Sequence, residues 1–395
     1  MSGHAYAEDQ LVEQPAIGLF AELGWATVSA LEEMFGAPSP GLAATLSHPM
    51  GEGASLGRET KGDVVLVSRL RAALERLNPA LPPEAIAAAV DELTRDRSAM
   101  SLEAANREVY LLLKEGIKVS VPDTGDSTPH PGPLPGRSGE GGGAQRSARP
   151  TSRPDGGALG TARPTSGGQK TERLRVVDWE HPADNDFLLV SQLSVTGALY
   201  ACRPDLVGFV NGLPLVVIEL KKPGVPARAA FDENLTHYKQ QIPALFWYNA
   251  LLIASNGTDS RVGSLTADWG RFFEWKRIER EDEPRRVSLD TMIRGTCDRT
   301  RLLDLVENFT LFSEHKAGLV KIIGQNHQVL GVNNTIASMM RVRAAVVAGI
   351  LPASQDGILP PDHRPPNPCA HPNSDPNSAE QDARLWSLDI LEDQS

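Results

Sequence analysis

The 395-residue sequence has few aromatic residues, few cysteines and no long hydrophobic run. No stretch approaches the roughly 18 consecutive apolar residues of a membrane-spanning helix, so we expect no membrane partner. The three cysteines stand apart without a CxxC pair, which argues against a disulfide framework or a zinc site. The first residues, MSGHAYAEDQ, have neither the basic nor the apolar region of a secretory signal, so we expect a cytoplasmic protein.

The sequence also lacks an excess of positive charge. Its 39 Lys and Arg against 50 Asp and Glu give a formal net charge of −11. A purely electrostatic nucleic-acid binder would be basic, so the composition argues mildly against that class. An enzyme that gathers carboxylates around a metal ion remains compatible with it. Hydrophobic residues make up 41% of the chain, which is enough for most of it to bury a core.

Helical patterns dominate residues 1–121, which we expect to form an N-terminal helical part. A first helix is predicted from near Gln14 to Gly24, because Pro15 would interrupt an earlier start. Two further helices are predicted between Pro83 and Lys114, each with one apolar stripe.

Two segments lack large apolar side chains and predict disorder. Residues 122–168 hold 8 Pro and 12 Gly and contain the pentapeptide ARPTS twice. Such a segment cannot offset the entropy of ordering its backbone, and we interpret it as a disordered insertion. Its five arginines leave a basic tether as the alternative. Residues 347–395 are rich in proline and predict a disordered tail.

Strand signals dominate residues 169–299, which we expect to form a sheet core. A helical pattern, RAAFDENLTHYKQQI, lies between the last two strand segments, which predicts an α/β or α+β sheet. Residues 300–346 are expected to be a helical connector, from the patterns LLDLVENFTLF and HKAGLVKII. The predicted strand segments are LRVVDW, LLVSQLSV, PDLVGFV, PLVVIEL and ALLIAS.

The segment RPDLVGFVNGLPLVVIELKKPG places two acids and a lysine at the ends of a predicted β-hairpin. Asn211-Gly212 between two apolar runs is a strong hairpin signal. Asp205 stands where the first strand begins, and Glu219 and Lys221 stand where the second strand ends. The hairpin register therefore decides whether these charged side chains share one face of the sheet.

A simple two-residue turn would pair Asp205 with Ile218 and send Glu219 to the opposite face. Pro214 has no N–H to give to the ladder beside the turn. It therefore favours a three- or five-residue loop, or a bulge, which pairs Asp205 with Glu219. Lys221 would then follow on the same face.

Two carboxylates that face each other across a hairpin repel and need a cation between them. Magnesium fits, because it takes one or two carboxylates and keeps waters for phosphate substrates. Lys221 would then stand beside the metal, where an ammonium can orient a water and balance phosphate charge. The alternative is that all three residues are solvated ends of ordinary strands.

Pro204-Asp205, followed by Glu219-Leu220-Lys221, resembles the PD-(D/E)xK nuclease motif. Longer segments over about residues 5–122 and 168–340 resemble the restriction (R) subunit of type I restriction–modification enzymes. The resemblance implies an α/β nuclease fold with a central mixed sheet flanked by helices, and with helical extensions at both ends. The segments that carry it are YAEDQLVEQPAI, REVYLLLKEGIKV, GQKTERLRVVDWE, NDFLLVSQ, CRPDLVGFVNGLPLVVIELKKP, NLTHYKQQIPALFWYNALLIASNG and LLDLVENFTLF with NHQVLGVN.

The resemblance also implies the chemistry. Asp205, Glu219 and Lys221 take the catalytic positions, with Asp205, Glu219 and the Leu220 carbonyl as Mg²⁺ ligands. The implied activity is that of a type I site-specific deoxyribonuclease acting in host defence. The implied partners are DNA and the methyltransferase and specificity subunits of a restriction complex.

An upstream helical acid often completes such sites. Glu13 is preferred over Glu8 because it lies closer to the predicted helix; a solvated carboxylate at a helix start is the alternative. The family carries a Q-x-x-x-Y element on the helix after the catalytic strand, and Asn234 and Tyr238 occupy it here, on one helix face. Asn234 reaches one methylene less far than the family's Gln. Tyr238 is equally well explained as a packed amphipathic residue.

The remaining candidates concern DNA and nucleotide contacts. Lys222 and Arg228 are candidates for phosphate contacts, with a solubilising surface as the alternative. Gln328, in NHQ, is a candidate for contacting adenine. No G-x-x-x-x-G-K-[ST] occurs in the sequence, so we expect ATP binding only in the complete family architecture.

Three functions therefore stay open from the sequence. The first is the magnesium-dependent endonuclease region of a type I R subunit, without its ATPase motor. The second is a truncated, non-catalytic remnant that at most binds DNA or the methyltransferase subunits. The third is a stand-alone magnesium nuclease that shares the site but not the partners.

Overall fold

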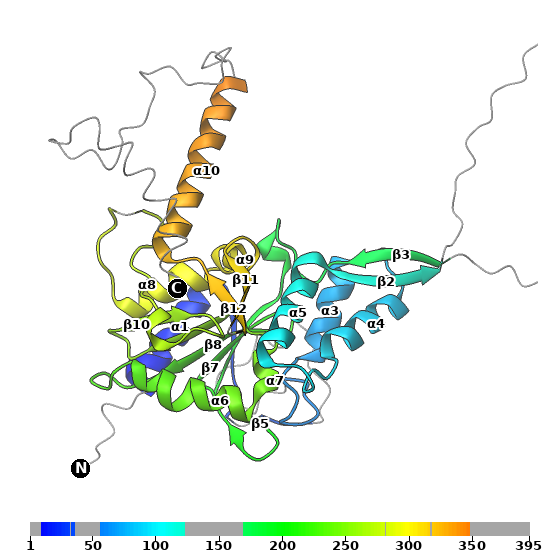
Figure 1. Cartoon of the computed structure of the whole chain (residues 1–395), viewed down its shortest axis with the longest axis horizontal. Helices are drawn as coiled ribbons and strands as arrows, with labels where there is room; N and C mark the ends of the chain where they lie inside the picture. Colours follow the sequence, from blue (N-terminus) through cyan, green and yellow to red (C-terminus); the bar gives the residue numbers. More distant parts are fainter. Residues whose placement is uncertain are drawn as a thin grey trace, which may run out of the picture. The chain divides into compact units, whose positions relative to one another are not determined.

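A computed structural model of the chain describes residues 9–31, 33–35, 56–122, 169–280, 282–316 and 318–347 (Figure 1). The chain divides into two compact units, residues 1–330 and 331–395, and the second is described only where it belongs to a helix. Apart from their first residues, the predicted insertion (122–168) and tail (347–395) lie outside the described residues. Among the helices that are described, none combines the length and apolarity needed to cross a membrane.

A six-stranded mixed sheet lies at the centre of the first unit, in the order β1-β4-β7-β8-β9-β10 (Figure 1). β1 pairs parallel with β4 and β8 pairs parallel with β9, and the other neighbours are antiparallel. The predicted mixed α/β architecture is confirmed. The strands are β1 (Ala26–Ser29), β4 (Phe187–Ser191), β7 (Leu206–Val210), β8 (Leu213–Leu220), β9 (Leu251–Ser255) and β10 (Ser260–Gly263).

Every residue of β4, β7, β8 and β9 is buried, which accounts for the unbroken apolar runs of these strands. Helices flank the sheet: α1 packs on β1 and β4, α8 packs on α1 and β10, and η3 packs on β8 and β9. The flanking helical elements are η1 (Asp9–Glu13), α1 (Gln14–Glu22), η3 (Ala230–Leu235), α6 (Thr236–Gln241), α7 (Pro243–Phe246), α8 (Ser288–Cys297) and α9 (Arg299–Glu307).

The predicted helices between residues 83 and 114 form as α4 and α5, beside a third helix, α3, that the sequence did not indicate (Figure 1). Proline stands in the first turn of α4, and the Ser101 hydroxyl caps α5 by accepting from Ala104 N at 3.3 Å. A two-stranded antiparallel ribbon follows them. The elements are α3 (Val67–Leu77), α4 (Pro83–Thr94), α5 (Leu102–Glu115), β2 (Ile117–Pro122) and β3 (Gln169–Leu174).

The β7–β8 hairpin has a two-residue turn and a bulge. Asn211 and Gly212 have φ values of 51° and 79°, the left-handed pair of a tight hairpin turn. Val210 pairs with Leu213 next to this turn, as the simple turn requires. The register then shifts between Gly208 and Phe209.

Beyond the shift, Leu206 pairs with Ile218. Asp205 and Glu219, the next residues on each side, are thereby brought opposite each other. The predicted bulge is confirmed and the longer loop is not formed, because the bulge takes up the extra residue on β8 between Pro214 and Val216.

Two secondary-structure predictions are wrong. The strand expected over LRVVDW ends at Leu174, because the backbone of the next residues turns away from the ladder. The end of LLDLVENFTLF, from Thr310 on, and the segment HKAGLVKII are not helical, because their residues pair in a second hairpin instead. The remaining elements are β5 (Val195–Thr196), β6 (Ala201–Cys202), η2 (Pro182–Asp184), η4 (Trp269–Arg271), β11 (Thr310–His315), β12 (Gly318–Ile323) and α10 (Asn326–Val347).

Candidate functional site

Asp205 is held at the start of β7 by contacts to both neighbouring strands. Its Oδ2 accepts a hydrogen bond from the backbone N–H of Leu220 at 2.8 Å. Its backbone carbonyl accepts from the N–H of Gln192, at the end of β4, at 2.7 Å. The side chain is half-buried, and Oδ1 lies toward the side-chain amide of Gln192. The hairpin therefore fixes one carboxylate oxygen against the backbone of the residue that follows Glu219.

Glu219 is a buried carboxylate at the end of β8, with only 2% of its surface exposed. The ammonium of Lys221 lies 3.7 Å from Glu219 Oε1. The same ammonium donates to Asn234 Oδ1 at 2.8 Å. A buried charge needs a partner of opposite sign or strong hydrogen bonds, and Lys221 supplies one. The structure thus brings Asp205, Glu219 and Lys221 to one end of the sheet.

Asn234 and Tyr238 stand four residues apart and face this cluster from η3 and α6. Asn234 Nδ2 donates to the Tyr238 hydroxyl at 3.1 Å. That hydroxyl lies 3.4 Å from Glu219 Oε1 and 3.4 Å from the Arg203 carbonyl, and it can donate to one of them at a time. Asn234 therefore reaches Lys221 in spite of its short side chain. The π-helical turn η3 presents it there, a backbone form that recurs at functional sites.

Burial raises the pKa of Tyr238, and the nearby negative charge of Glu219 raises it further. Burial also raises the pKa of the Cys202 thiol, and the negative charge of Glu219 adds a smaller increase. Both groups therefore stay protonated at neutral pH. Tyr238 acts in this cluster as a hydroxyl donor and not as a phenolate.

Glu13 joins the cluster from the π-helical turn η1, and it is 7% exposed. Gln192 Nε2 donates to Glu13 Oε2 at 2.9 Å and lies 3.4 Å from Asp205 Oδ1. The interpretation of Glu13 as a solvated carboxylate is therefore wrong, because the residue is buried among other polar groups. Glu8, the other candidate, lies outside the described residues.

Gln192 was not singled out from the sequence, although it connects two of the carboxylates. It is one of two non-glycine residues with positive φ among the described residues, at 55°. Such a conformation is costly for a residue with a side chain and concentrates at functional sites. The one signal in the sequence is its place, a polar residue directly after the buried run of β4. Its partner at position 13 is 179 residues away, and no local pattern indicates that contact.

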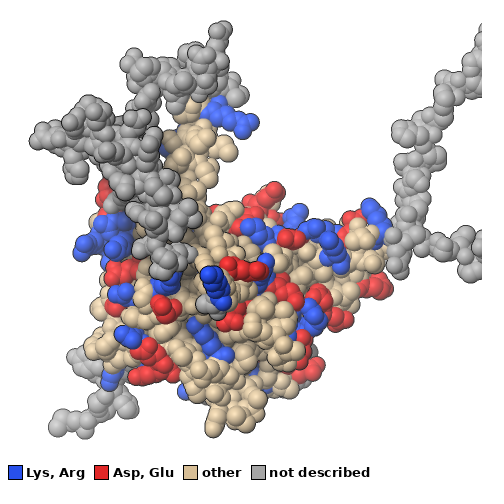
Figure 2. All heavy atoms as spheres, viewed as in Figure 1, with Lys and Arg blue, Asp and Glu red and all other residues tan. Residues whose placement is uncertain are grey.

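The hydrogen bonds of Arg228 and Gln328 lie apart from this cluster. Arg228 pairs with Asp232 on its own helical turn at 2.9 Å, and Lys222 is exposed. Gln328 is exposed, and its Oε1 accepts from the Gln325 N–H at 2.9 Å at the start of α10. On the face drawn in Figure 2, basic and acidic residues are interspersed. Among the described residues visible on that face, no broad basic surface stands out.

A second acidic group lies at the other end of β4. Asp178, His181 and Asp184 can bring ligand atoms within 4.8 Å of one another, the one such set of three among the described residues. Asp178 already accepts from the His181 N–H and from Arg175, both at 2.9 Å. Burial opposes the charged form, but these two groups outweigh it and lower the pKa of Asp178. We interpret Asp178 as the residue that ties this loop together.

The carboxylates around Gln192 fit a hard divalent cation by their chemistry. One oxygen each of Glu13 and Asp205 lies within 3.4 Å of the same amide nitrogen, and Glu219 follows from the facing strand. Carboxylate oxygens are the ligands that such ions take. With Glu219 these oxygens are spread more widely than the set around Asp178.

The chain matches the family described as the type I restriction enzyme R protein N terminus, over residues 5–131 and 159–271. It is 33% identical over 294 residues to the type I restriction enzyme HindI endonuclease subunit of Haemophilus influenzae. That match covers 71% of this chain and 24% of the relative.

Two further relatives have the same description. One is the putative MjaIXP endonuclease subunit of Methanocaldococcus jannaschii, 31% identical over 38% of this chain and 17% of the relative. The other is the EcoprrI endonuclease subunit of Escherichia coli, 30% identical over 38% of this chain and half of the relative. The chain thus spans about a quarter of the Haemophilus subunit, and the region around β7 and β8 lies within the family match.

Proposed function

Because the chain belongs to the family of type I restriction enzyme R proteins, we propose that it carries a magnesium-dependent endonuclease site for DNA. The observation that carries this proposal is the gathering of Asp205, Glu219 and Lys221 at one end of the hairpin, with Glu13 joined through Gln192. Three carboxylates and one ammonium are the groups that metal-assisted hydrolysis of a phosphodiester uses.

In this proposal, Asp205, Glu219 and the Leu220 carbonyl hold Mg²⁺, and Glu13 is an accessory acid. A bound magnesium ion would polarise the phosphoryl group and lower the pKa of a coordinated water. Lys221 places its ammonium beside the reacting phosphate, where it balances negative charge and orients the attacking water. Asn234 fixes Lys221 through the 2.8 Å hydrogen bond.

The remaining residues shape the site. The Tyr238 hydroxyl can donate a hydrogen bond to Glu219 Oε1, and its raised pKa keeps this hydroxyl protonated. The Leu220 N–H holds Asp205 Oδ2, so that Oδ1 is turned toward Gln192 and the other carboxylates. These contacts orient the acids before any substrate binds, as precise positioning requires.

The partners follow from the family as part of the same proposal. The chain would act in the cytoplasm on DNA, together with methyltransferase and specificity subunits in host defence. ATP would be required only by the complete family architecture, and Gln328 stays a predicted adenine contact. Lys222 and Arg228 stay predicted phosphate contacts.

A plasmid-nicking assay with the 395-residue chain tests the site. Supercoiled DNA is incubated with Mg²⁺, with and without ATP and the partner subunits. Asp205→Asn and Glu219→Gln keep the side-chain shape and remove the charge, so we expect nicking to fall by roughly a hundredfold or more. Lys221→Gln should lose activity similarly. Glu233→Gln is the matched control, because Glu233 is exposed on η3 and changes the charge by the same amount.

Two results would count against the proposal in different ways. Parental nicking by Asp205→Asn and Glu219→Gln would show that the assigned residues are wrong. A folded parent chain that binds DNA but never nicks it, even with partners, ATP and Mg²⁺, would favour the non-catalytic alternative.

A further inference from the structure

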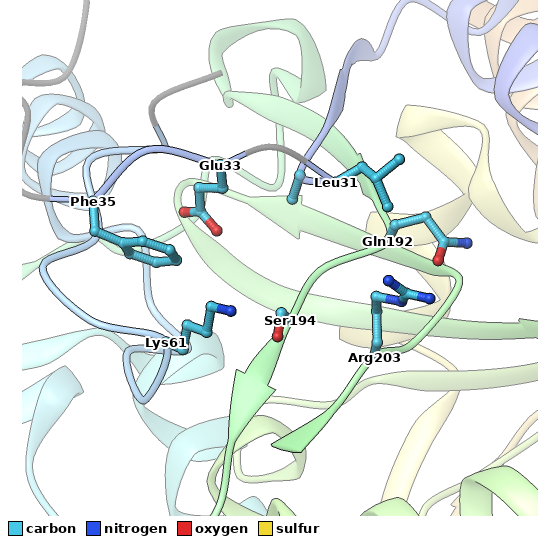
Figure 3. Close-up of a pocket in the computed structure, with 8 residues that line it drawn as sticks. Leu31, Glu33, Phe35, Lys61, Gln192, Ser194 and Arg203 are labelled. Atoms are coloured by element: carbon cyan, nitrogen blue, oxygen red, sulfur yellow. The ribbon is translucent and has the colours of Figure 1, made fainter. Parts of the chain in front are cut away.

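A small pocket of about 140 Å³ adjoins the carboxylate cluster (Figure 3). Gln192 belongs to both, since it lines the pocket and donates to Glu13. Arg203, another lining residue, stands two positions before Asp205, and its carbonyl lies 3.4 Å from the Tyr238 hydroxyl. The pocket and the proposed catalytic site therefore share one wall.

Two cations enter this pocket from different segments. Figure 3 shows Lys61 and Arg203 on either side of Ser194. Both side chains are exposed, and neither forms an ion pair with another described residue. The Lys61 Nζ lies 5.9 Å from the centre of the Phe35 ring. This cation–π contact positions the ammonium, and the uncharged ring does not neutralise it.

Among the described residues that line the pocket, Glu33 is the one carboxylate, and Arg58 neutralises it. Arg58 donates to both of its oxygens, through Nε to Oε1 at 2.9 Å and through Nη2 to Oε2. The Arg58 side chain is fully buried and also donates to the Ser194 carbonyl at 3.0 Å. Of the charged groups among the described lining residues, those of Lys61 and Arg203 therefore remain for a ligand. The hydroxyl of Ser194 adds a hydrogen-bond donor.

We propose that this pocket binds a backbone phosphate of the DNA strand, next to the phosphate that is hydrolysed. The inference rests on the proposed function. A guanidinium and an ammonium that line one pocket, and that form no ion pair with a described carboxylate, suit a phosphodiester, which carries one negative charge and acceptor oxygens. Because base edges carry the sequence and phosphates do not, this subsite orients the strand without selecting a sequence.

The test measures DNA binding separately from cleavage. A labelled duplex is titrated with the chain in Ca²⁺ or EDTA by fluorescence anisotropy at several salt concentrations. Lys61→Gln and Arg203→Gln should each reduce the slope of log affinity against log salt by about 0.9, one phosphate contact each. The double variant should bind roughly tenfold more weakly, as expected for two exposed ion pairs.

Lys118→Gln is the matched control, because Lys118 is exposed on the β2–β3 ribbon and lines no part of the pocket. Its slope and affinity should equal those of the parent. Thermal unfolding of all variants should be unchanged, since the altered side chains are exposed.

Competition with inorganic phosphate distinguishes a site for the DNA backbone phosphate from a site for free phosphate. We expect it to compete with DNA only weakly, and less still in the double variant. A double variant that loses phosphate binding but keeps parental DNA affinity and slope would overturn the proposal in favour of a free-phosphate site. Unchanged slopes in both single variants would overturn it as well. A parent that never cleaves but shows the expected slopes would refute the proposed nuclease activity and leave this subsite standing.

Discussion

The amide of Gln192 donates to the carboxylate of Glu13 at 2.9 Å, which joins the end of β4 to the π-helical turn η1. The same amide lies 3.4 Å from Asp205 Oδ1. Two negative groups are thus held side by side by one neutral donor, on a backbone with φ of 55°. The hydrogen bonds must offset both the left-handed conformation and the repulsion between the acids.

Gln192→Ala should therefore impair Mg²⁺-dependent nicking more strongly than it lowers the stability of the fold. Losing a hydrogen bond to a charged group costs about 1.5–3 kcal/mol, so we expect nicking to fall about tenfold or more. The Mg²⁺ concentration for half-maximal rate should rise, and the KM for DNA should change little. Gln192→Glu keeps the shape but adds a like charge, and it should be more impaired than Gln192→Ala. Magnesium titrations that coincide for parent and variants would refute the positioning role.

A second prediction concerns Asn234, which accepts from Lys221 at 2.8 Å and donates to Tyr238 at 3.1 Å. Asn234→Ala removes the hydrogen bond that positions the Lys221 ammonium. We therefore expect kcat to fall about tenfold while KM is nearly unchanged. Asn234→Gln restores the residue of the family element and should retain most of the activity. The measurement is steady-state nicking with DNA varied at saturating Mg²⁺. Equal losses in Asn234→Ala and Asn234→Gln would argue that the site requires the shorter side chain.

A third prediction concerns the turn that sets the hairpin register. A Cβ on Gly212 would lie 2.6 Å from the Leu66 carbonyl oxygen and 2.7 Å from the Leu70 nitrogen, both backbone atoms. Its φ is also +79°, in the region that favours glycine. Gly212→Ala should therefore lower the free energy of unfolding by about 2–4 kcal/mol, from left-handed strain together with overpacking.

Gly224→Ala separates these two causes. Gly224 has φ of +94°, but a Cβ there meets nothing within 4 Å. We expect it to cost only about 1–2 kcal/mol in urea unfolding, the part that comes from the backbone conformation. Equal losses at the two positions would mean that the approach of α3 to the turn contributes nothing.

The hairpin and its charged ends could be predicted because their signals are local. Asn211-Gly212 specifies the turn, and Pro214 requires a break in the ladder, so the pairing of Asp205 with Glu219 follows within a short segment. The role of Gln192 could not be predicted, since it depends on a partner 179 residues away. The second hairpin was missed because short apolar runs fit helical and extended periods equally well.

Lys321, on the second strand of that hairpin, is fully buried and has no acidic partner among the described residues. Its Nζ donates to the Asn249 carbonyl at 2.6 Å and to Asn106 Oδ1 at 3.1 Å, which ties β12 to α5 and the core. Burial lowers the pKa of Lys321 to about 7. The group is therefore largely neutral in the folded chain at alkaline pH, but it keeps its proton in the unfolded chain up to about 10.5.

Between these two pKa values the unfolded chain binds more protons than the folded one. The contribution of Lys321 to stability is therefore fully present above about pH 10.5 and is lost as the pH falls toward 7. We expect the free energy of unfolding to rise with pH in this window, by at most about 1.4 kcal/mol per pH unit from this residue. Lys321→Met fills the same space without a titrating group, so its urea-unfolding curves should give a flatter pH profile. Lys118→Met, at an exposed position, should keep the parental profile. If the Lys321→Met and parental profiles run parallel from pH 7 to 10, Lys321 keeps its proton in the folded protein, and the 2.6 Å hydrogen bond to Asn249 is that of an ammonium.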